Sequence, residues 1–219
     1  MQIPGSEKAV PAFRYLLPLL AGLLISGPVL ADPVEDYERG LASYRAGDLV
    51  GSMAPLKRAA DAGHAPSQAL YGTILDSAEF DDEAVVYLRK AAEQNDPEGQ
   101  YALAKMYQTG EGVARDDAEA ARLLRAAAAA GHSTAIIGLA RAYIVGNARL
   151  GADDPTRPEA AEFILKAAEI GDVAVMRALV KAYREGGFGI PPDAKQADEW
   201  AARLAQAEGG DTKAAGRKK

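Results

Sequence analysis

Residues 97–132 read PEGQYALAKMYQTGEGVARDDAEAARLLRAAAAAGH, and this stretch decides the fold. Its first part has a helical pattern in which Leu103 and Tyr107 lie one turn apart. A glycine-containing loop follows from Gly110, and an alanine-rich segment then runs to Gly131. Glycine at that position suits the left-handed residue that ends many helices. The stretch therefore predicts two helices joined by a loop.

The same pattern recurs along the chain at intervals of 32 to 40 residues. An alanine pair lies late in each unit, at Ala59–Ala60, Ala91–Ala92, Ala127–Ala128 and Ala167–Ala168, and Leu204–Ala205 takes its place in the fifth copy. Five residues before the second member of each pair, the chain carries Pro55, Tyr87, Leu123, Phe163 or Trp200, most of them large and apolar. Positions with this spacing share one side of a helix, so large and small residues can interlock with a neighbouring helix.

These units predict an all-α fold, a right-handed α-solenoid of about five helix pairs. The composition agrees, because 47 of the 219 residues are alanine, which favours helix strongly and strand weakly. We expect the pairs at 34–46/49–62, 66–78/81–94, 97–109/116–130, 133–146/158–170 and 173–186/193–207. One pair alone buries too little surface to be stable, so residues 32–207 are expected to form a single helical repeat domain.

Two loops carry the resemblance to a known family. The third unit has Gly110-Glu-Gly112-Val113 followed by Asp116, and the fifth has Gly187-Phe-Gly189-Ile190 followed by Asp193. These motifs and the alanine pairs resemble the Sel-one-like repeat, a tetratricopeptide variant with a longer glycine-containing loop. The resemblance covers about 36–207 and implies a non-catalytic interaction module. It also implies that an exported bacterial member acts as a scaffold in an envelope complex.

The first 31 residues are expected to be a secretory signal peptide. Lys8 and Arg14 precede an uncharged, leucine-rich stretch, and Val29 and Ala31 place small residues at the −3 and −1 positions of a cleavage site. An uncleaved membrane anchor is the alternative, although the uncharged stretch is short for a span of about 20 residues. Cleavage after Ala31 would give a periplasmic or secreted protein without stable membrane insertion. Residues 208–219 are expected to be a disordered basic tail.

The composition excludes several kinds of chemistry. The chain has no cysteine, which excludes disulfides and thiol catalysis, and its net charge of −6 argues against nucleic-acid binding. His64 and His132 lie two repeats apart, so we expect them at turns rather than at a metal. Asp116 and Asp193 precede helices and are expected to cap them. We find no catalytic residues, no metal ligands and no cofactor motif, and we expect no enzyme.

A basic and partly aromatic face is expected on the first helices of the later repeats. Lys105, Arg141 and Lys181 each lie two residues after the leucine of a Leu-x3-Tyr pattern. By resemblance to tetratricopeptide arrays, these positions line a concave groove, and the full set of groove residues is Tyr101, Lys105, Gln108, Arg141, Ile144, Arg177, Lys181 and Arg184. Such a groove suits an extended anionic segment or a carboxylate terminus. The alternative is a solvated helix face whose cations pair with nearby acids such as Glu98 and Glu185.

Three functions are compatible with these sequence features. The first is an exported adaptor that holds a protein or peptide of the cell envelope in its groove. The second is a factor that binds an anionic glycan or peptidoglycan. The repeat aromatics Tyr44, Tyr107, Tyr143, Tyr183 and Trp200 are expected to be buried, which favours a protein partner over a glycan. The third is a β-lactam-processing enzyme, which the missing cysteines and the missing nucleophile disfavour.

Overall fold

The structure is a computed structural model that describes residues 32–216, with side chains described as far as residue 209. The expected signal peptide and the last three residues of the chain lie outside the described residues. Within this range the chain forms ten α-helices and one short 3-10 helix, which confirms the all-α repeat fold. The helices are α1 (Pro33–Arg45), α2 (Leu49–Asp61), α3 (Ala65–Ser77), α4 (Asp81–Glu93), α5 (Pro97–Thr109), α6 (Asp117–Ala129), α7 (Ser133–Val145), η1 (Ala148–Leu150), α8 (Pro158–Ile170), α9 (Val173–Glu185) and α10 (Ala194–Gly216).

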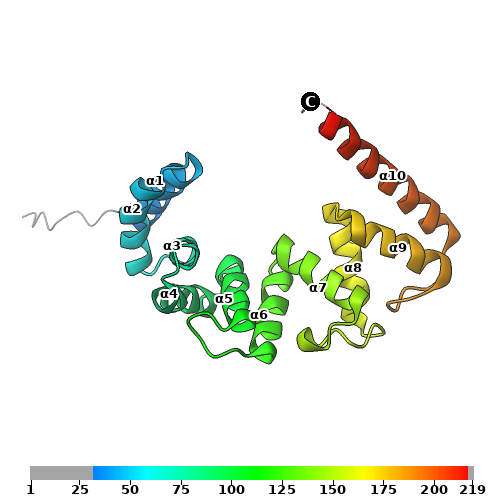
Figure 1. Ribbon diagram of the computed structural model, residues 1–219, viewed down its shortest axis with the longest axis horizontal. Helices are drawn as coiled ribbons and strands as arrows, with labels where there is room; N and C mark the ends of the chain where they lie inside the picture. The colour runs from blue at the N-terminus through cyan, green and yellow to red at the C-terminus, as the bar shows by residue number, and fades with distance from the viewer. Residues whose placement is uncertain (1–31, 217–219) are drawn as a thin grey trace, which may run out of the picture. The chain divides into compact units, whose positions relative to one another are not determined.

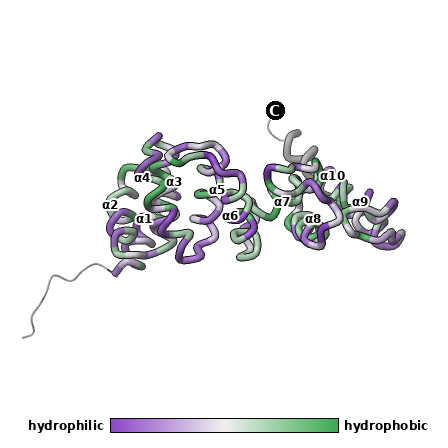
Figure 2. Tube along the Cα trace, turned by 90° about the horizontal axis from the view of Figure 1, so that it is seen from below, coloured by the Kyte–Doolittle hydropathy of each residue, from purple (hydrophilic) through white to green (hydrophobic). Residues whose placement is uncertain are grey.

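The helices pack as five consecutive pairs, each a first helix followed by a second helix (Figure 1). The second helix of each pair also contacts the first helix of the next pair. In addition, the first helices α3 and α5 contact each other, as do α7 and α9. The first helices therefore form one layer of the array and the second helices the other. Along each helix, hydrophobic and hydrophilic residues alternate, as expected for segments that bury one side (Figure 2).

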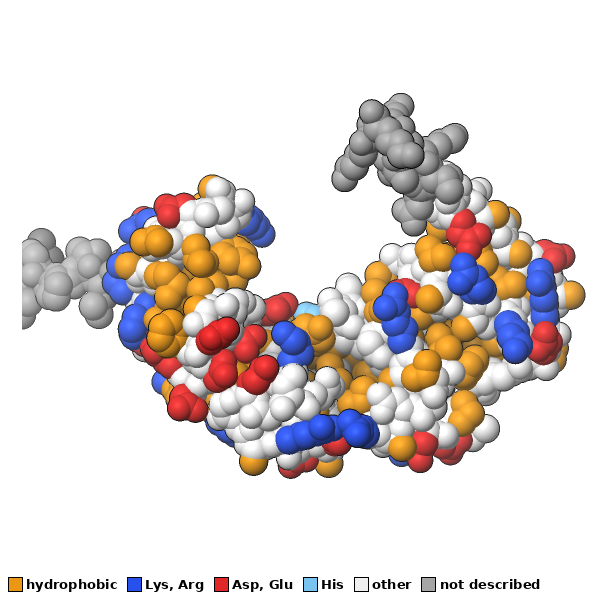
Figure 3. Space-filling view, viewed as in Figure 1, with side chains coloured by type: hydrophobic (Ala, Val, Ile, Leu, Met, Phe, Trp, Pro, Cys, Tyr) orange, Lys and Arg blue, Asp and Glu red, His pale blue; other side chains and the backbone are white. Residues whose placement is uncertain are grey.

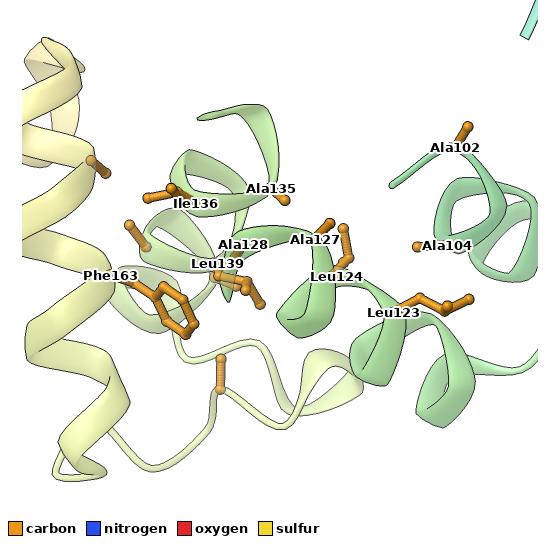
Figure 4. Packing of buried hydrophobic residues seen from close by; sticks show 14 of the residues in the cluster. Ala102, Ala104, Leu123, Leu124, Ala127, Ala128, Ala135, Ile136, Leu139 and Phe163 are labelled. Carbon is orange, nitrogen blue, oxygen red and sulfur yellow. The ribbon is translucent and has the colours of Figure 1, made fainter. Parts of the chain in front are cut away.

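The core runs through the array at the contacts between these helices. The alanine pairs are buried, except that Ala92 is half-buried. The large residues expected beside them, Tyr87, Leu123, Phe163 and Trp200, are each at most 7% exposed. Figure 4 shows Leu123, Leu124 and Phe163 directed toward neighbouring helices of this core. Buried apolar area is the main stabilising term of such a fold, so each repeat depends on its neighbours.

Within the first two helix pairs, glycine permits a close contact between the two helices, and these are the pairs with the shortest connecting loops. The loops of three residues at 46–48 and 78–80 join pairs whose eighth residue is Gly40 or Gly72. A Cβ atom on Gly72 would lie 2.7 Å from Leu88 Cγ, and one on Gly40 would lie 2.6 Å from Leu56 Cγ. Where the loops are longer, alanine or valine takes the same position. Short loops therefore draw the two helices of a pair together, and only glycine fits between them.

The loops of the third and fifth repeats close in the same way. The Asp116 amide donates to the Tyr107 carbonyl at 2.9 Å, and the Asp193 amide donates to the Tyr183 carbonyl at 2.8 Å. Both aspartates also cap the following helix, as expected: Asp116 Oδ1 accepts from the amide of Glu119 at 2.9 Å, and Asp193 Oδ1 accepts from that of Gln196 at 3.0 Å. Capping by these side chains satisfies amides that have no partner inside the helix.

Two expectations from the sequence need correction. The last helix continues to Gly216, whereas a disordered tail was expected from residue 208. Helix-forming residues such as Ala207 and Glu208 continue the pattern, and Glu208 also pairs with Arg177 of α9. The second correction concerns the repeat aromatics: Tyr143 and Trp200 are buried as expected, but Tyr107 and Tyr183 are half-buried and Tyr44 is 41% exposed. Tyr44 is the twelfth residue of α1, whereas Tyr107 is the eleventh of α5, and one residue turns a side chain by about 100° around a helix.

Candidate functional site

The expected groove residues all lie on first helices and occupy equivalent positions. The fifth, ninth and twelfth residues are Tyr101, Lys105 and Gln108 on α5; Ile137, Arg141 and Ile144 on α7; and Arg177, Lys181 and Arg184 on α9. Each of these three repeats therefore contributes one side chain at the fifth, one at the ninth and one at the twelfth position of its first helix. The side chains of Lys105, Arg141 and Lys181 are 54%, 60% and 74% exposed.

Each of these three cations has an acidic partner. Lys105 lies 3.9 Å from Asp76 of the preceding first helix, and Arg141 lies 2.6 Å from Asp172 at the start of α9. Lys181 lies 3.9 Å from Glu185 of its own helix. The Lys181–Glu185 pair is exposed on both sides and contributes about 0–1 kcal/mol, so an anionic ligand can replace Glu185 at little cost. Asp76 and Asp172 are more buried, with side chains 21% and 7% exposed.

The balance of charge changes along α9. Arg177 pairs with Glu208 at 2.6 Å, while Arg184 forms no ion pair with any residue in the described part of the chain. In Figure 3 the basic side chains on the visible face lie as separate groups rather than as one continuous patch. The cations of the later repeats are thus spaced along the array.

The aromatic member of the expected groove is packed rather than free. The ring of Tyr101 stacks on His132, with centroids 4.5 Å apart. His132 Nε2 lies 3.0 Å from Glu98 Oε2, and its Nδ1 accepts a hydrogen bond from the amide of Ala135. Tyr101, Gln108 and Ile144 are half-buried. Both histidines immediately precede helices, as expected, and the ring of His64 contacts that of Tyr37 in a tilted arrangement, with centroids 4.9 Å apart.

The first two repeats do not continue the basic surface. The fifth, ninth and twelfth residues of α1 are Tyr37, Leu41 and Tyr44, and the ninth and twelfth residues of α3 are Thr73 and Asp76. Their place on this surface was not evident from the sequence, because repeats one and two lack the Leu-x3-Tyr order. Burial raises the pKa of Asp76, and the nearby Lys105 opposes that rise. The first-helix face, meaning the fifth, ninth and twelfth residues of the first helices, therefore changes from apolar to acidic to basic along the chain.

Two networks of buried and half-buried polar side chains connect helices away from this face. Asp36 is 1% exposed and accepts hydrogen bonds from both Arg58 Nε and Nη2, at 2.9 and 2.7 Å, which hold its pKa below the ordinary value. Burial opposes ionisation of Glu159, but hydrogen bonds from Tyr143 and Arg125 outweigh it and lower the pKa of Glu159. Arg125 also donates to the carbonyl of Leu150 at 2.9 Å, which fixes the insertion before α8.

These networks connect helices and carry no catalytic arrangement. Among the described residues, no group of three histidine, aspartate or glutamate side chains could hold a metal ion. No helix in the described range is both long and apolar enough to cross a membrane. The glycines of the two long loops have positive φ values, such as 84° at Gly110 and 74° at Gly189. Glycine adopts this backbone conformation readily, which explains its presence at these positions.

The fold and its surface define a helical repeat protein built from stacked helix pairs. The Sel1 repeat family model matches residues 81–96, 97–132 and 178–208. These matches cover the third repeat and parts of the second and fifth, and they confirm the expected resemblance to the Sel1 repeat. Sel1 repeat proteins generally mediate protein–protein interactions and are typically non-catalytic scaffolds.

Solved structures agree with this assignment. A protective antigen present in uropathogenic Escherichia coli strains, displaying an SLR fold, is 28% identical, with a TM-score of 0.65; the match covers 80% of this chain and 38% of the antigen. A Sel1 repeat protein from Oxalobacter formigenes is 29% identical, with a TM-score of 0.63 and coverage of 83% and 76%. A sel1 repeat protein from Klebsiella pneumoniae subsp. pneumoniae, at 20% identity and a TM-score of 0.52 over 80% of this chain and 87% of that one, shares the fold. The search of curated proteins found no significant match.

Proposed function

We propose that this chain is an exported adaptor that binds a protein or peptide of the bacterial cell envelope through its first-helix face. The observation that carries the proposal is the repetition of Lys105, Arg141 and Lys181 at the ninth position of three consecutive first helices. Each is more than half exposed and pairs with one acidic side chain. An extended anionic segment would meet one cation per repeat.

Location in the envelope rests on the sequence of residues 1–31. A cleaved leader predicts that the protein recovered from cells begins at Asp32 and is found outside the cytoplasm. The intact mass of the native protein tests this directly. A recovered chain that retains residues 1–31 would contradict cleavage and would favour the anchor.

The binding proposal is tested by cross-linking the tagged protein in cells and identifying the captured material by mass spectrometry. The test variant carries Lys105→Gln, Arg141→Gln and Lys181→Gln, because neutral residues avoid new repulsion with Asp76, Asp172 and Glu185. The matched control carries Arg115→Gln, Lys166→Gln and Lys195→Gln, which also break surface ion pairs but lie away from the first-helix face.

The proposal expects one reproducible envelope protein with the wild type and the control, lost in the test variant. Equal capture by all three proteins would contradict binding through the first-helix face. Co-purification with cell wall or polysaccharide, without a protein partner, would indicate the glycan-binding alternative. A covalent adduct with a fluorescent penicillin would instead show β-lactam chemistry.

A further inference from the structure

A cavity of about 320 Å³ lies between α4, α5 and α6, on the side of the second helices. Leu103 and Leu123 provide apolar lining, and Arg89, Glu93 and Gln100 provide polar groups. Its volume is at the lower end of the range of about 300–1,000 Å³ for ligand-binding pockets. None of these residues belongs to the first-helix face.

The side-chain amide of Gln100 has an oxygen without a hydrogen-bond donor. Gln100 is 5% exposed, and its Oε1 atom is buried without a hydrogen bond. A buried acceptor without a donor is destabilising, and few such groups occur in folded proteins. No group in the described part of the chain donates a hydrogen bond to this oxygen.

In the preceding repeat, the equivalent glutamine oxygen does accept a hydrogen bond. Gln68 is the fourth residue of α3, as Gln100 is of α5. Gln68 Nε2 donates to the carbonyl of Ala60 at 3.0 Å, and its Oε1 accepts from Gln94 Nε2 at 2.7 Å. Gln94 follows α4, and the equivalent residue after α6 is Ala130, which has no side-chain donor.

The same comparison explains the empty volume. Between α2 and α4, the space is filled by Tyr71 and Tyr87, whose rings meet edge to face with centroids 4.9 Å apart. The equivalent seventh residues of α5 and α6 are Leu103 and Leu123. Later repeats carry Phe163 and Trp200 at the position of Leu123 in the repeat pattern. At this position the second, fourth and fifth repeats therefore carry an aromatic ring, and the third repeat carries leucine.

Polar residues that could bind a tyrosine hydroxyl are nevertheless present beside the cavity. In the preceding repeat, the Tyr87 hydroxyl donates to Asp61 at 2.7 Å and accepts from Lys57 at 3.0 Å. The equivalent thirteenth and ninth residues of α4 are Glu93 and Arg89. Neither forms an ion pair with any other described residue, although Arg89 lies over the Tyr107 ring at 5.9 Å.

We propose that this cavity binds the side chain of a tyrosine residue from a partner polypeptide. The phenol ring occupies the space over Leu103 and Leu123, and its hydroxyl donates to Glu93 and accepts from Arg89. The backbone amide of the bound residue donates to Gln100 Oε1, a contact that a simple phenol cannot add. This inference rests on the proposed function as a protein-binding array and adds a second contact with a stated residue type.

The test is a titration of the purified, isotope-labelled protein with N-acetyl-tyrosinamide, followed by NMR. Saturable shifts are expected at the Gln100 side-chain amide and at Ala126, with at least tenfold weaker binding of N-acetyl-phenylalaninamide. Equal binding of the two compounds, or no shift at these groups, would overturn the proposal.

Variants place the ligand within the cavity. Leu123→Tyr fills the space as Tyr87 does and is expected to abolish binding. Glu93→Gln leaves the apolar core untouched and is expected to reduce the preference for tyrosinamide over phenylalaninamide at least fivefold. Unchanged binding by Glu93→Gln would overturn the assignment, even if Leu123→Tyr failed to fold.

A third variant tests the role of the unpaired Gln100 Oε1 atom separately. Ala130→Gln supplies the donor that Gln94 provides in the preceding repeat, so it is expected to raise Tm by about 2–4 °C and to weaken tyrosinamide binding at least threefold. An unchanged Tm together with unchanged binding would contradict a role for Gln100.

The result is separable from that of the proposed function. Absence of tyrosinamide binding, with capture of a partner intact, would overturn the cavity site alone. Binding of tyrosinamide by a protein that captures no partner would support the cavity and contradict the adaptor function.

Discussion

Replacement of Gly72 by alanine tests the claim that short loops force the two helices of a pair together. The new Cβ would lie 2.7 Å from Leu88 Cγ and 3.2 Å from the carbonyl oxygen of Ala84. Leu88 is fully buried among core residues, so its movement would displace neighbouring side chains. Overpacking of this kind costs about 1–3 kcal/mol, while alanine gains about 1 kcal/mol over glycine in helix propensity. The net expectation is a loss of about 0–2 kcal/mol.

Gly138 provides the matched control. It also lies within a helix, α7, but a Cβ atom there would have no neighbour within 4 Å. Gly138→Ala should therefore gain about 1 kcal/mol from helix propensity alone. For a chain of this size, 1 kcal/mol corresponds to about 2–4 °C in Tm.

The assay is urea unfolding followed by circular dichroism, with thermal unfolding as a second readout. The two alanine variants should differ by about 1–3 kcal/mol in the free energy of unfolding, with Gly138→Ala the more stable. If Gly72→Ala stabilised the protein as much as Gly138→Ala, the close approach of α3 and α4 would not be limited by this position.

Three further predictions concern polar groups. Asp36→Asn should reduce the free energy of unfolding by about 1.5–3 kcal/mol at pH 7, as expected for hydrogen bonds to a charged group. The pKa of Asp36 is lowered in the folded state, so its contribution to stability is present above the unfolded pKa of about 4 and is lost as pH falls through the folded pKa. The urea unfolding curves of variant and wild type should therefore converge at lower pH. Tyr143→Phe removes a hydrogen bond to Glu159 and should cost about 0.5–1.5 kcal/mol in the same assay, and it should raise the pKa of Glu159 measured by NMR titration. Asp116→Ala and Asp193→Ala each remove a helix cap and should each cost about 1 kcal/mol, and the double variant should lose the sum because the two sites share no partner.

The helix pairs could be predicted from the sequence because the repeat fixes several boundaries at once. Alanine pairs, glycine breaks and capping aspartates place most helix ends within one residue of those observed. The end of α10 was not predicted in this way, because Gly209 and Gly210 lie inside the helix rather than at its end. Its extension depends on side chains such as Glu208 meeting α9, which is a tertiary contact.

The candidate surface was predicted less completely. Equivalent positions of Lys105, Arg141 and Lys181 follow from the repeat, but their partners Asp76 and Asp172 come from neighbouring repeats and depend on how the helices stack. The cavity beside Gln100 was not found from the sequence. Leu123 looked like one more large apolar residue, and only the structure shows the space left where the preceding repeat holds a tyrosine ring.

The central claim is that the first-helix face contacts a protein partner, and site-specific photo-cross-linking in cells tests it most directly. A photoreactive residue is placed at Arg184, which is exposed on α9, and, as a control, at Asp198, which is exposed on α10. Binding through the first-helix face predicts a cross-linked envelope protein from position 184 that is absent from position 198. Cross-linking from position 198 alone, or the same product from both positions, would contradict binding through that face.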